Sequence, residues 1–288
     1  MINFLRYKWL YSIISLIVIS VGLFSIIRWG YHYSIDFVGG SNIIYQINKK
    51  IDLNKTIDYL KNKNIKLTYY VYNNNQLMLK LPPIDENQET KLRQDLNKQF
   101  NLSIKTLKFE TVGPVIGQET INKTMIASLF AVLGILIYMS FAFKGTNYAI
   151  SAVLATLHDF FVVIGTYSLL SHFFGAEVDT LFVTAVLTTM TFSTHDTIVI
   201  FDKIREYLKE KGRGSAEYYA NRAVTETMVR SINNSMTILF MLLALTLLGG
   251  TTIRFFSLTL LIGTITGTYS SPFVATPILV WLEKKRKN

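Results

Sequence analysis

The chain has 288 residues, half of them hydrophobic, and a formal net charge of +10, with 29 Lys and Arg against 19 Asp and Glu. The apolar residues lie in blocks of membrane-spanning length rather than in short amphipathic pieces, which excludes an ordinary soluble globular protein. The chain contains no cysteine, so disulfides and thiolate chemistry are excluded as well.

Six apolar segments are long enough to cross a membrane, because about 20 consecutive apolar residues span a hydrocarbon core roughly 30 Å thick. In chain order they are Trp9–Ile27, Met125–Phe143, Ala149–Leu170, Leu181–Ile200, Ser231–Leu248 and Phe255–Leu282. The last segment contains Pro272 and Pro277, so we expect a tilted or kinked helix there. The predicted fold class is a polytopic α-helical membrane protein with six transmembrane helices.

Basic residues are unevenly distributed between the two sides of these segments. They crowd the N-terminus, the connections after spans two and four, and the C-terminal tail, whereas the two short loops on the other side hold only Arg254. The positive-inside rule then places both termini in the cytoplasm. We interpret the basic tails as topology signals, so no nucleic acid is expected as a partner. The first span lacks a small-x-small cleavage site and is expected to remain as an anchor.

These assignments divide the chain into four parts. Residues 1–27 form the cytoplasmic N-terminus and the first span, and residues 28–124 form an extracytoplasmic domain. Residues 125–282 form spans two to six, with a cytoplasmic loop at 201–230, and residues 283–288 form a basic cytoplasmic tail.

The extracytoplasmic segment is more polar than the rest and shows alternating strand and helix patterns. The expected elements are a strand at Asn42–Ile47, a helix at Leu53–Asn64, two strands within Ile65–Pro83, a helix at Glu86–Phe100 and a strand at Ile104–Val112. The order β-α-β-β-α-β predicts a ferredoxin-like α+β domain. Turn-type residues flank it, namely Asp36, Gly39, Gly40, Gly113 and Pro114, and we interpret them as structural.

A single carboxylate, Asp196, lies inside the fourth span. A charge at a helix centre costs roughly 2.5–3.5 kcal/mol on insertion scales, and ionisable residues within spans usually mark ion or proton pathways. Arg230 opens the fifth span and is followed at helical spacing by Asn233, Asn234 and Thr237, which would share one face. We expect Asp196 and Arg230 to approach each other directly or through water, and a purely static ion pair is the simpler alternative.

Other features of the spans have weaker implications. His158 and Asp159 lie near the middle of the third span; Asp159 could instead hydrogen-bond a Ser or Thr, and His158 and His195 could simply pack. Gly263 and Gly267 have a small-xxx-small spacing that favours close helix packing. An intramembrane hydrolase built on His158/Asp159 or His195/Asp196 is disfavoured, because no G-x-S-x-G motif, HExxH motif or cysteine nucleophile accompanies them. No metal site and no enzymatic activity are expected.

Five stretches of the chain together resemble the SecF family of bacterial protein-export membrane proteins. They are "IDFVGG", "VGPVIGQE", "HDTIVIFDKIRE", "RSINNSMT" with the later "LLGG", and "GTYSSPFVATP", extending from residue 35 to 277. The family has the same layout of six spans with one large outer domain and belongs to the RND transporter superfamily. Two departures stand out: His195 replaces an asparagine common in the family, and Lys203 replaces an arginine.

The resemblance implies a subunit of the Sec protein translocase that acts with SecD in the plasma (inner) membrane. It implies association with the SecYEG channel, contact with YajC and YidC, an unfolded preprotein as substrate, and surrounding membrane lipid. It also implies use of the proton-motive force, with protons as coupling ion, no cofactor, and a relay through Asp196 and Arg230. His158, Asp159, His195, Asn233 and Asn234 would support that relay. The alternatives are a non-conducting scaffold for SecD and a stand-alone exporter of small molecules or lipids.

Overall fold

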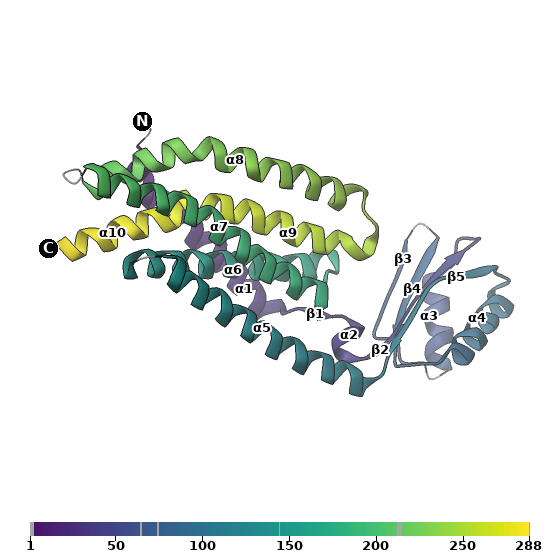
Figure 1. The fold of residues 1–288 in the computed structure, drawn as a ribbon. Coiled ribbons are helices and arrows are strands. Elements are labelled where there is room, and N and C mark those ends of the chain that lie inside the picture. Colours follow the sequence, from purple (N-terminus) through teal and green to yellow (C-terminus); the bar gives the residue numbers. More distant parts are fainter. Residues whose placement is uncertain (1–2, 64, 74, 144, 212–214, 288) are drawn as a thin grey trace. The chain divides into compact units, whose positions relative to one another are not determined.

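The computed structural model describes residues 3–63, 65–73, 75–143, 145–211 and 215–287. The chain forms two compact units: Met1–His32 together with Ile126–Asn288 make a helical unit, and Tyr33–Met125 make a smaller α+β unit. The predicted outer domain had boundaries at 28 and 124. Figure 1 shows the order of the elements along the chain.

The α+β unit contains a four-stranded antiparallel sheet with strand order β3-β4-β2-β5. Its strands are β2 (Gly40–Ile47), β3 (Tyr69–Asn73), β4 (Gln76–Leu81) and β5 (Ile104–Val112). Its helices are α2 (Ile35–Val38), α3 (Leu53–Asn62) and α4 (Glu86–Phe100), and the chain order of strands and longer helices is the predicted β-α-β-β-α-β. Strand β2, the first strand of this sheet in chain order, pairs with both β4 and β5 and therefore lies inside the sheet.

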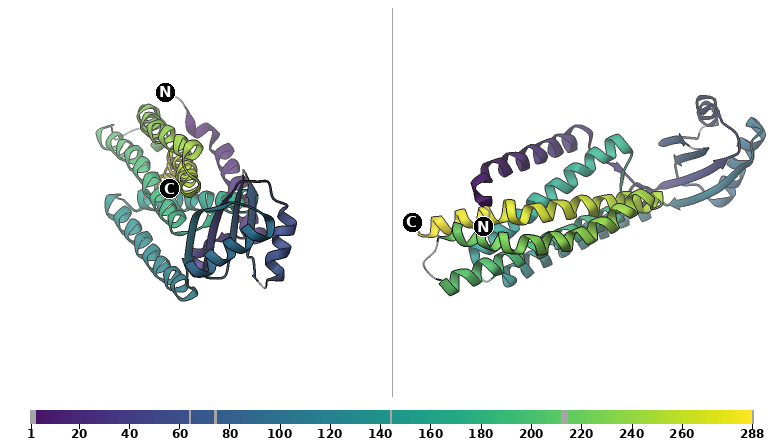
Figure 2. Two further views of the ribbon diagram at one scale, coloured as in Figure 1. Left: turned by 90° about the vertical axis from the view of Figure 1, so that its right-hand side faces the viewer. Right: turned by 90° about the horizontal axis from the view of Figure 1, so that it is seen from above.

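Helices α3 and α4 lie on one face of the sheet, and the core of this unit lies between them and the sheet (Figures 1 and 2). Alternate residues of β2, Ile43, Tyr45 and Ile47, are buried, as a period of two requires. Leu60 of α3 and Leu96 of α4 pack against them. Helix α4 begins with a capping box between Asp85 and Gln88, and Asp52 caps α3. The sequence pattern therefore accounts for both helix starts and the buried face.

The helical unit consists of long helices with short connections. They are η1 (Phe4–Tyr7), α1 (Lys8–Trp29), α5 (Pro114–Ala142, shared at its start with the α+β unit), α6 (Thr146–Phe174), α7 (Thr180–Lys211), α8 (Ala216–Leu248), α9 (Thr251–Ser270), the π-helical turn η2 (Ser271–Ala275) and α10 (Thr276–Lys287). Two short strands, β1 (His32–Tyr33) and β6 (Glu177–Val178), complete the element list. The N- and C-termini lie at the same end of this unit (Figure 1).

Four helical segments among the described residues are long and apolar enough to cross a membrane: Phe4–Trp29, Pro114–Ala142, Thr146–Phe174 and Ala216–Leu248. They contain the first, second, third and fifth predicted spans, the second ending at Ala142 rather than Phe143. The fourth and sixth predicted spans lie in α7 and in α9 to α10, and they stay predictions. Helix α7 is rich in threonine, and its hydroxyls donate to carbonyls one turn earlier, as Thr188 does to Thr184 O at 2.7 Å. These bonds satisfy polar groups that an apolar surrounding would leave unpaired.

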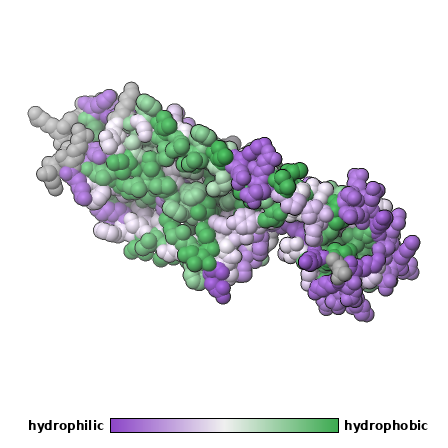
Figure 3. Space-filling model, turned by 90° about the horizontal axis from the view of Figure 1, so that it is seen from below, coloured by the Kyte–Doolittle hydropathy of each residue, from purple (hydrophilic) through white to green (hydrophobic). Residues whose placement is uncertain are grey.

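The surface of the helical unit is unusually apolar. Large hydrophobic side chains are exposed along it, including Leu16, Phe130 and Leu247 at 66%, 69% and 70%. Figure 3 shows hydrophobic residues covering much of this unit. Such a surface suits a hydrocarbon solvent and would be an aggregation hazard in water.

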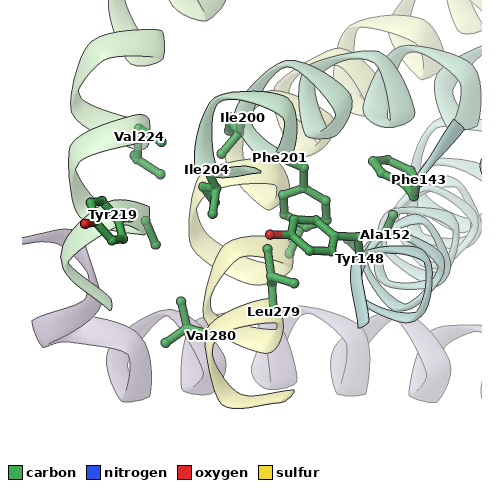
Figure 4. Packing of buried hydrophobic residues seen from close by; sticks show 14 of the residues in the cluster. Phe143, Tyr148, Ala152, Ile200, Phe201, Ile204, Tyr219, Val224, Leu279 and Val280 are labelled. Carbon is green, nitrogen blue, oxygen red and sulfur yellow. The ribbon is translucent and has the colours of Figure 1, made fainter. Parts of the chain in front are cut away.

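The interior of the helical unit has its main hydrophobic cluster near the end that carries both chain termini. Figure 4 shows Phe201 of α7 facing Phe143 and Tyr148, with ring centroids 5.5 Å away in each case. Ile204 of the same helix and Leu279 of α10 are fully buried there. This cluster ties α7 to α6 and to the last helix.

The segment 201–230, expected as a cytoplasmic loop, is mostly helical. Helix α7 continues to Lys211 and α8 begins at Ala216, while residues 212–214 lie outside the described part of the chain. The Tyr207 and Tyr219 rings stack with centroids 6.3 Å apart and so pack the two extensions together. The connection between the fourth and fifth predicted spans is therefore built mainly from helical extensions, and its cytoplasmic location stays a prediction.

The last predicted span is continuous but changes helix type in its middle. Pro272 has no backbone N–H and cannot donate to the preceding turn, and a π-helical turn at Ser271–Ala275 accommodates it. Ser271 O accepts hydrogen bonds from both the backbone N–H and the hydroxyl of Thr276, the latter at 3.0 Å. The proline thus widens one turn of the helix while leaving it unbroken.

Candidate functional site

Asp196 of α7 lies beside a small pocket between α7, α8 and α9. Its side chain is half-buried, and its Oδ2 accepts a hydrogen bond from Ser231 Oγ of α8 at 2.9 Å. The pocket has a volume of about 20 Å³, and Asp196, Asn234 and Thr268 are among its lining residues. This is enough space for about one water molecule. A carboxylate with free acceptor positions therefore faces a polar space that water can occupy.

Arg230 does not pair with Asp196 among the residues that the structure describes, and its side chain is exposed. Its neighbour Ser231 faces α7 instead. Successive residues of a helix point about 100° apart, so only one of the two can face Asp196. The face of α8 that lines the pocket includes Asn234, Ser235 and Ile238. This face shares Asn234 with the predicted one, whereas Asn233 and Thr237 do not line the pocket.

Asp159 of α6 lies at the centre of a second polar cluster and is 2% exposed. Its Oδ2 accepts hydrogen bonds from Ser270 Oγ of α9 at 2.6 Å and from Ser193 Oγ of α7. Its Oδ1 lies 2.8 Å from Nδ1 of His158. One carboxylate thus joins three helices. Its hydrogen bonds to serines agree with the alternative that Asp159 simply hydrogen-bonds a Ser or Thr.

The two histidines near these carboxylates differ in environment. His158 is 8% exposed, and its Nε2 has no hydrogen-bond partner among the described residues. His195, one residue before Asp196, is exposed and lines the same small pocket. A buried ring nitrogen without a partner is uncommon, because an unpaired buried polar atom costs about 1–3 kcal/mol.

Close contact between α7 and α9 brings the second cluster together. A Cβ at Gly263 would lie 2.0 Å from Thr189 Cγ2, and a Cβ at Gly267 would lie 3.0 Å from Ser193 Cα. Ser270 follows Gly267 by nearly one turn, which brings its hydroxyl within reach of Asp159. The small-xxx-small pair therefore sets the distance at which α9 meets α7.

Several residues of this region were not singled out by the sequence analysis. Ser193, Ser270 and Ser231 bind the two carboxylates, and Thr197 Oγ1 lies 2.9 Å from Ser271 Oγ at the π-helical turn. A run of small hydroxyl residues on helices of membrane-spanning length was the available signal. Gly22 of α1 and Gly165 of α6 were also missed, although a Cβ at Gly22 would lie 2.8 Å from Gly165 Cα.

The flanking motif of the α+β unit lies away from both carboxylate clusters in sequence and forms turns. Gly39 and Gly40 have φ of 73° and 130°, which favour glycine, and a Cβ at Gly39 would lie 2.9 Å from Pro114 Cα. Gly113 O accepts a hydrogen bond from the Gly117 N–H at 3.0 Å at the start of α5. Asp36 lies in α2, whose N-cap Ser34 accepts its backbone N–H. These contacts are consistent with a structural role for the motif.

The fold and the two clusters define a class: a helical membrane protein with several long apolar helices, a small α+β unit, and carboxylates placed among its helices. Residues 92–285 match the family model described as "Protein export membrane protein SecD/SecF, C-terminal". The chain is 39% identical to the protein translocase subunit SecF of Thermobaculum terrenum, covering 99% of this chain and 95% of that protein. It is 31% identical to the SecF of a Synechocystis species, covering 95% of this chain.

The fold is similar to solved structures of the same group. The crystal structure of SecDF from Thermus thermophilus, a translocon-associated membrane protein, matches with a TM-score of 0.85 at 30% identity. The match covers 98% of this chain and 39% of that one, so the chain spans well under half of the SecDF polypeptide. SecDF in a super-membrane-facing form matches with a TM-score of 0.71.

The chain belongs to the SecD/SecF family of protein export membrane proteins, as a SecF subunit of the Sec protein translocase. It is a transport protein rather than an enzyme, and a multi-pass membrane protein. Its resemblance to SecF, expected from five short motifs, is confirmed over nearly the whole chain.

Proposed function

We propose that this chain pairs with SecD and uses the proton-motive force to promote preprotein movement through the SecYEG channel. In this proposal six helices span the bacterial plasma (inner) membrane, both termini lie in the cytoplasm, and the α+β unit lies outside. SecDF of Thermus thermophilus carries in one polypeptide a region similar to this chain, which supports a SecD partner for it. YajC and YidC are further proposed partners.

The proton relay in this proposal runs through Asp196 and Arg230. The observation that carries it is the position of Asp196, half-buried, held by one hydroxyl and facing a pocket with room for about one water. Asp196 takes up a proton from the outside and is neutral while the helices rearrange. A movement of α8 that turns its face replaces the Ser231 hydroxyl with the neighbouring Arg230 guanidinium, which favours the charged carboxylate and releases the proton inward.

The energy available is sufficient for such a step. Moving one charge across the membrane yields about 2.3 kcal/mol per 100 mV. One or two protons therefore bias a conformational equilibrium whose states differ by a few kcal/mol. His158, Asp159, His195, Asn233 and Asn234 are proposed as support for the relay, with Asp159 linking the helices that move.

Proton flux tests the relay. We expect vesicles containing this chain with SecD to show a proton flux that Asp196→Asn abolishes and Arg230→Gln strongly reduces. Asp202→Asn, on the same helix but exposed and paired with Arg205, is the matched control and should leave the flux unchanged. Intact SecD association in a pull-down excludes misassembly. Equal flux in Asp196→Asn and wild type would refute the relay, and no flux in either would favour a non-conducting scaffold.

A further inference from the structure

A pocket separate from both carboxylate clusters lies at the end of the helical unit where the two chain termini are found. It is formed by η1 and the first turns of α1, by the start of α8 and by α10, and its volume is about 250 Å³. Leu5 and Val280, 5% and 6% exposed, form part of its wall. The relay residues Asp196 and Arg230 do not line it.

The polar side of this pocket carries more positive than negative charge. Lys8 and Lys284 line it together with one carboxylate, Glu217, and the Lys284 ammonium donates to Glu217 Oε2 at 2.6 Å. Lys8 is exposed and has no carboxylate partner among the described residues. Ser12 adds a hydroxyl, which donates to Lys8 O at 3.0 Å. One ammonium group therefore remains available for an anion, with a second held close to the pocket.

The apolar side of the pocket carries two indole rings. Trp9 is 74% exposed and Trp281 is 55% exposed, and both line the pocket. Lys285 lies over the Trp281 ring at 4.3 Å and adds a further cation beside the pocket. Tryptophans concentrate where the hydrocarbon core meets the headgroup region, and Trp9 lies in the first turn of an apolar helix of spanning length. The pocket thus lies at the expected depth of lipid headgroups.

We propose that this pocket binds one anionic phospholipid, with the phosphate held by Lys8 and Lys284 and the upper acyl chains against Trp9 and Trp281. Free phosphate would use the ammonium groups alone and leave the indole wall uncovered. A zwitterionic lipid would cover the indoles but place its own cation beside the lysines. An anionic phospholipid satisfies both halves of the pocket, and basic pockets between helices are a recognised form of lipid-headgroup site.

The position of the pocket gives the bound lipid a structural consequence. Two of its walls come from the start of α1 and from α10, which lie at opposite ends of the sequence. A lipid held by Lys8 of α1 and Lys284 of α10 bridges these two helices at the membrane surface. Occupancy therefore stabilises the packing of the first helix on the last. The inference does not depend on the proton relay.

Native mass spectrometry of the delipidated full chain in detergent, titrated with defined lipids, tests this inference. We expect phosphatidylglycerol to bind in preference to phosphatidylcholine. The double variant Lys8→Gln with Lys284→Gln should weaken phosphatidylglycerol binding about tenfold or more, because each basic residue near the surface contributes roughly a fivefold preference. The matched control, Lys61→Gln with Lys209→Gln, removes the same charge from exposed positions that do not line the pocket and should bind like wild type.

Two further arms separate the possible ligands. Trp281→Ala should weaken phosphatidylglycerol and phosphatidylcholine alike, since it removes apolar contact without changing the charge. Inorganic phosphate at millimolar concentration should not displace the lipid. The proposal is overturned if the pocket and control variants bind equally, if Trp281→Ala has no effect, or if inorganic phosphate competes for the site. Unchanged thermal unfolding midpoints in lipid-free detergent confirm that the variants are folded.

Discussion

Asp159 and Asp196 are both carboxylates on long helices of the same unit, but their surroundings differ. Asp159 is buried and contacts Ser193, Ser270 and His158, so its acceptor positions are largely occupied. Asp196 has one hydroxyl partner and faces a small pocket. A carboxylate surrounded by donors from several helices holds those helices together, whereas one with free acceptors beside water can exchange a proton.

Replacing Asp159 with Asn tests its structural role. The amide retains one acceptor oxygen but cannot accept from both serines and the histidine as the carboxylate does, so we expect a loss of about 1–3 kcal/mol in unfolding free energy. Stability is measured by thermal or denaturant unfolding in detergent. The control Asp202→Asn, which breaks an exposed pair with Arg205, should cost under about 1 kcal/mol. Wild-type stability in Asp159→Asn would show that the hydrogen bonds are not stabilising.

For individual side chains, the sequence indicated which residues were unusual, but it could not indicate their hydrogen-bond partners. Asp196 stood out because a carboxylate in an apolar run is costly. The serines that bind Asp159 lie 34 and 111 residues away in the chain, and no local pattern joins them. Ser231 was overlooked in favour of Arg230, because a one-residue error in helix phase turns a side chain by about 100°.

Helices α7 and α9 pack closely beside the two carboxylate clusters, and glycines of α9 make this close contact possible. Gly263→Ala should destabilise the protein by about 1–3 kcal/mol, because its Cβ would lie 2.0 Å from Thr189 Cγ2. Thr189 Cβ would also lie 2.4 Å from the added atom, so combining the change with Thr189→Gly, which removes both Thr189 carbons, should restore part of the loss. Gly134→Ala is the matched control, since a Cβ there meets nothing within 4 Å. Equal unfolding midpoints for Gly263→Ala and Gly134→Ala would contradict this packing.

The extensions of α7 and α8 beyond the predicted spans carry a pH-sensitive contact. The Tyr207 hydroxyl, and then Arg222, hydrogen-bond to Glu226 and lower the pKa of its carboxyl group. A lowered folded-state pKa stabilises the fold above the unfolded value, about 4.3, and this contribution is lost as pH falls through the folded value. We expect Glu226→Gln to be less stable than wild type at pH 7, with the difference shrinking below about pH 4. The measurement is the unfolding midpoint at both pH values, and a constant difference would contradict the assignment.

The element order of the α+β unit followed from periodicity, while the extent of α7 and α8 did not. The residues between these two spans are charged enough to suggest a loop, yet Tyr207 and Tyr219 supply a packing face that only the folded pair uses. The π-helical turn is a similar case. Pro272 predicted a distortion of the helix. The hydrogen bonds of Ser270 to Asp159 and of Ser271 to Thr197 hold the helix in place at the start of this turn, and no local sequence pattern predicted them.

The molecule as a whole has two units stabilised in different solvents. The helical unit exposes apolar side chains, while the α+β unit has an enclosed core that includes Ile43, Leu60 and Leu79. The sheet and its own helices α3 and α4 enclose this core, so the helical unit is not needed to bury it. The hydropathy of the sequence predicted this division, because the polar residues are concentrated in one continuous segment between the first and second apolar blocks.

A fragment of residues 34–113 should therefore fold on its own as a soluble monomer with a cooperative thermal transition. Circular dichroism and size-exclusion chromatography check this. Leu79→Ala, at a fully buried position, should cost about 2–5 kcal/mol in that fragment. Lys61→Gln, at an exposed site, should be nearly neutral. A fragment without a cooperative transition would show that the unit needs the rest of the chain.

The most direct test of the central claim is preprotein translocation into vesicles that contain this chain, SecD and SecYEG, measured with and without a proton-motive force. We predict that the proton-motive force accelerates late translocation in the wild type and in Asp202→Asn, and that Asp196→Asn loses this acceleration while its rate without the gradient is unchanged. Full acceleration in Asp196→Asn, with SecD still bound, would contradict the account.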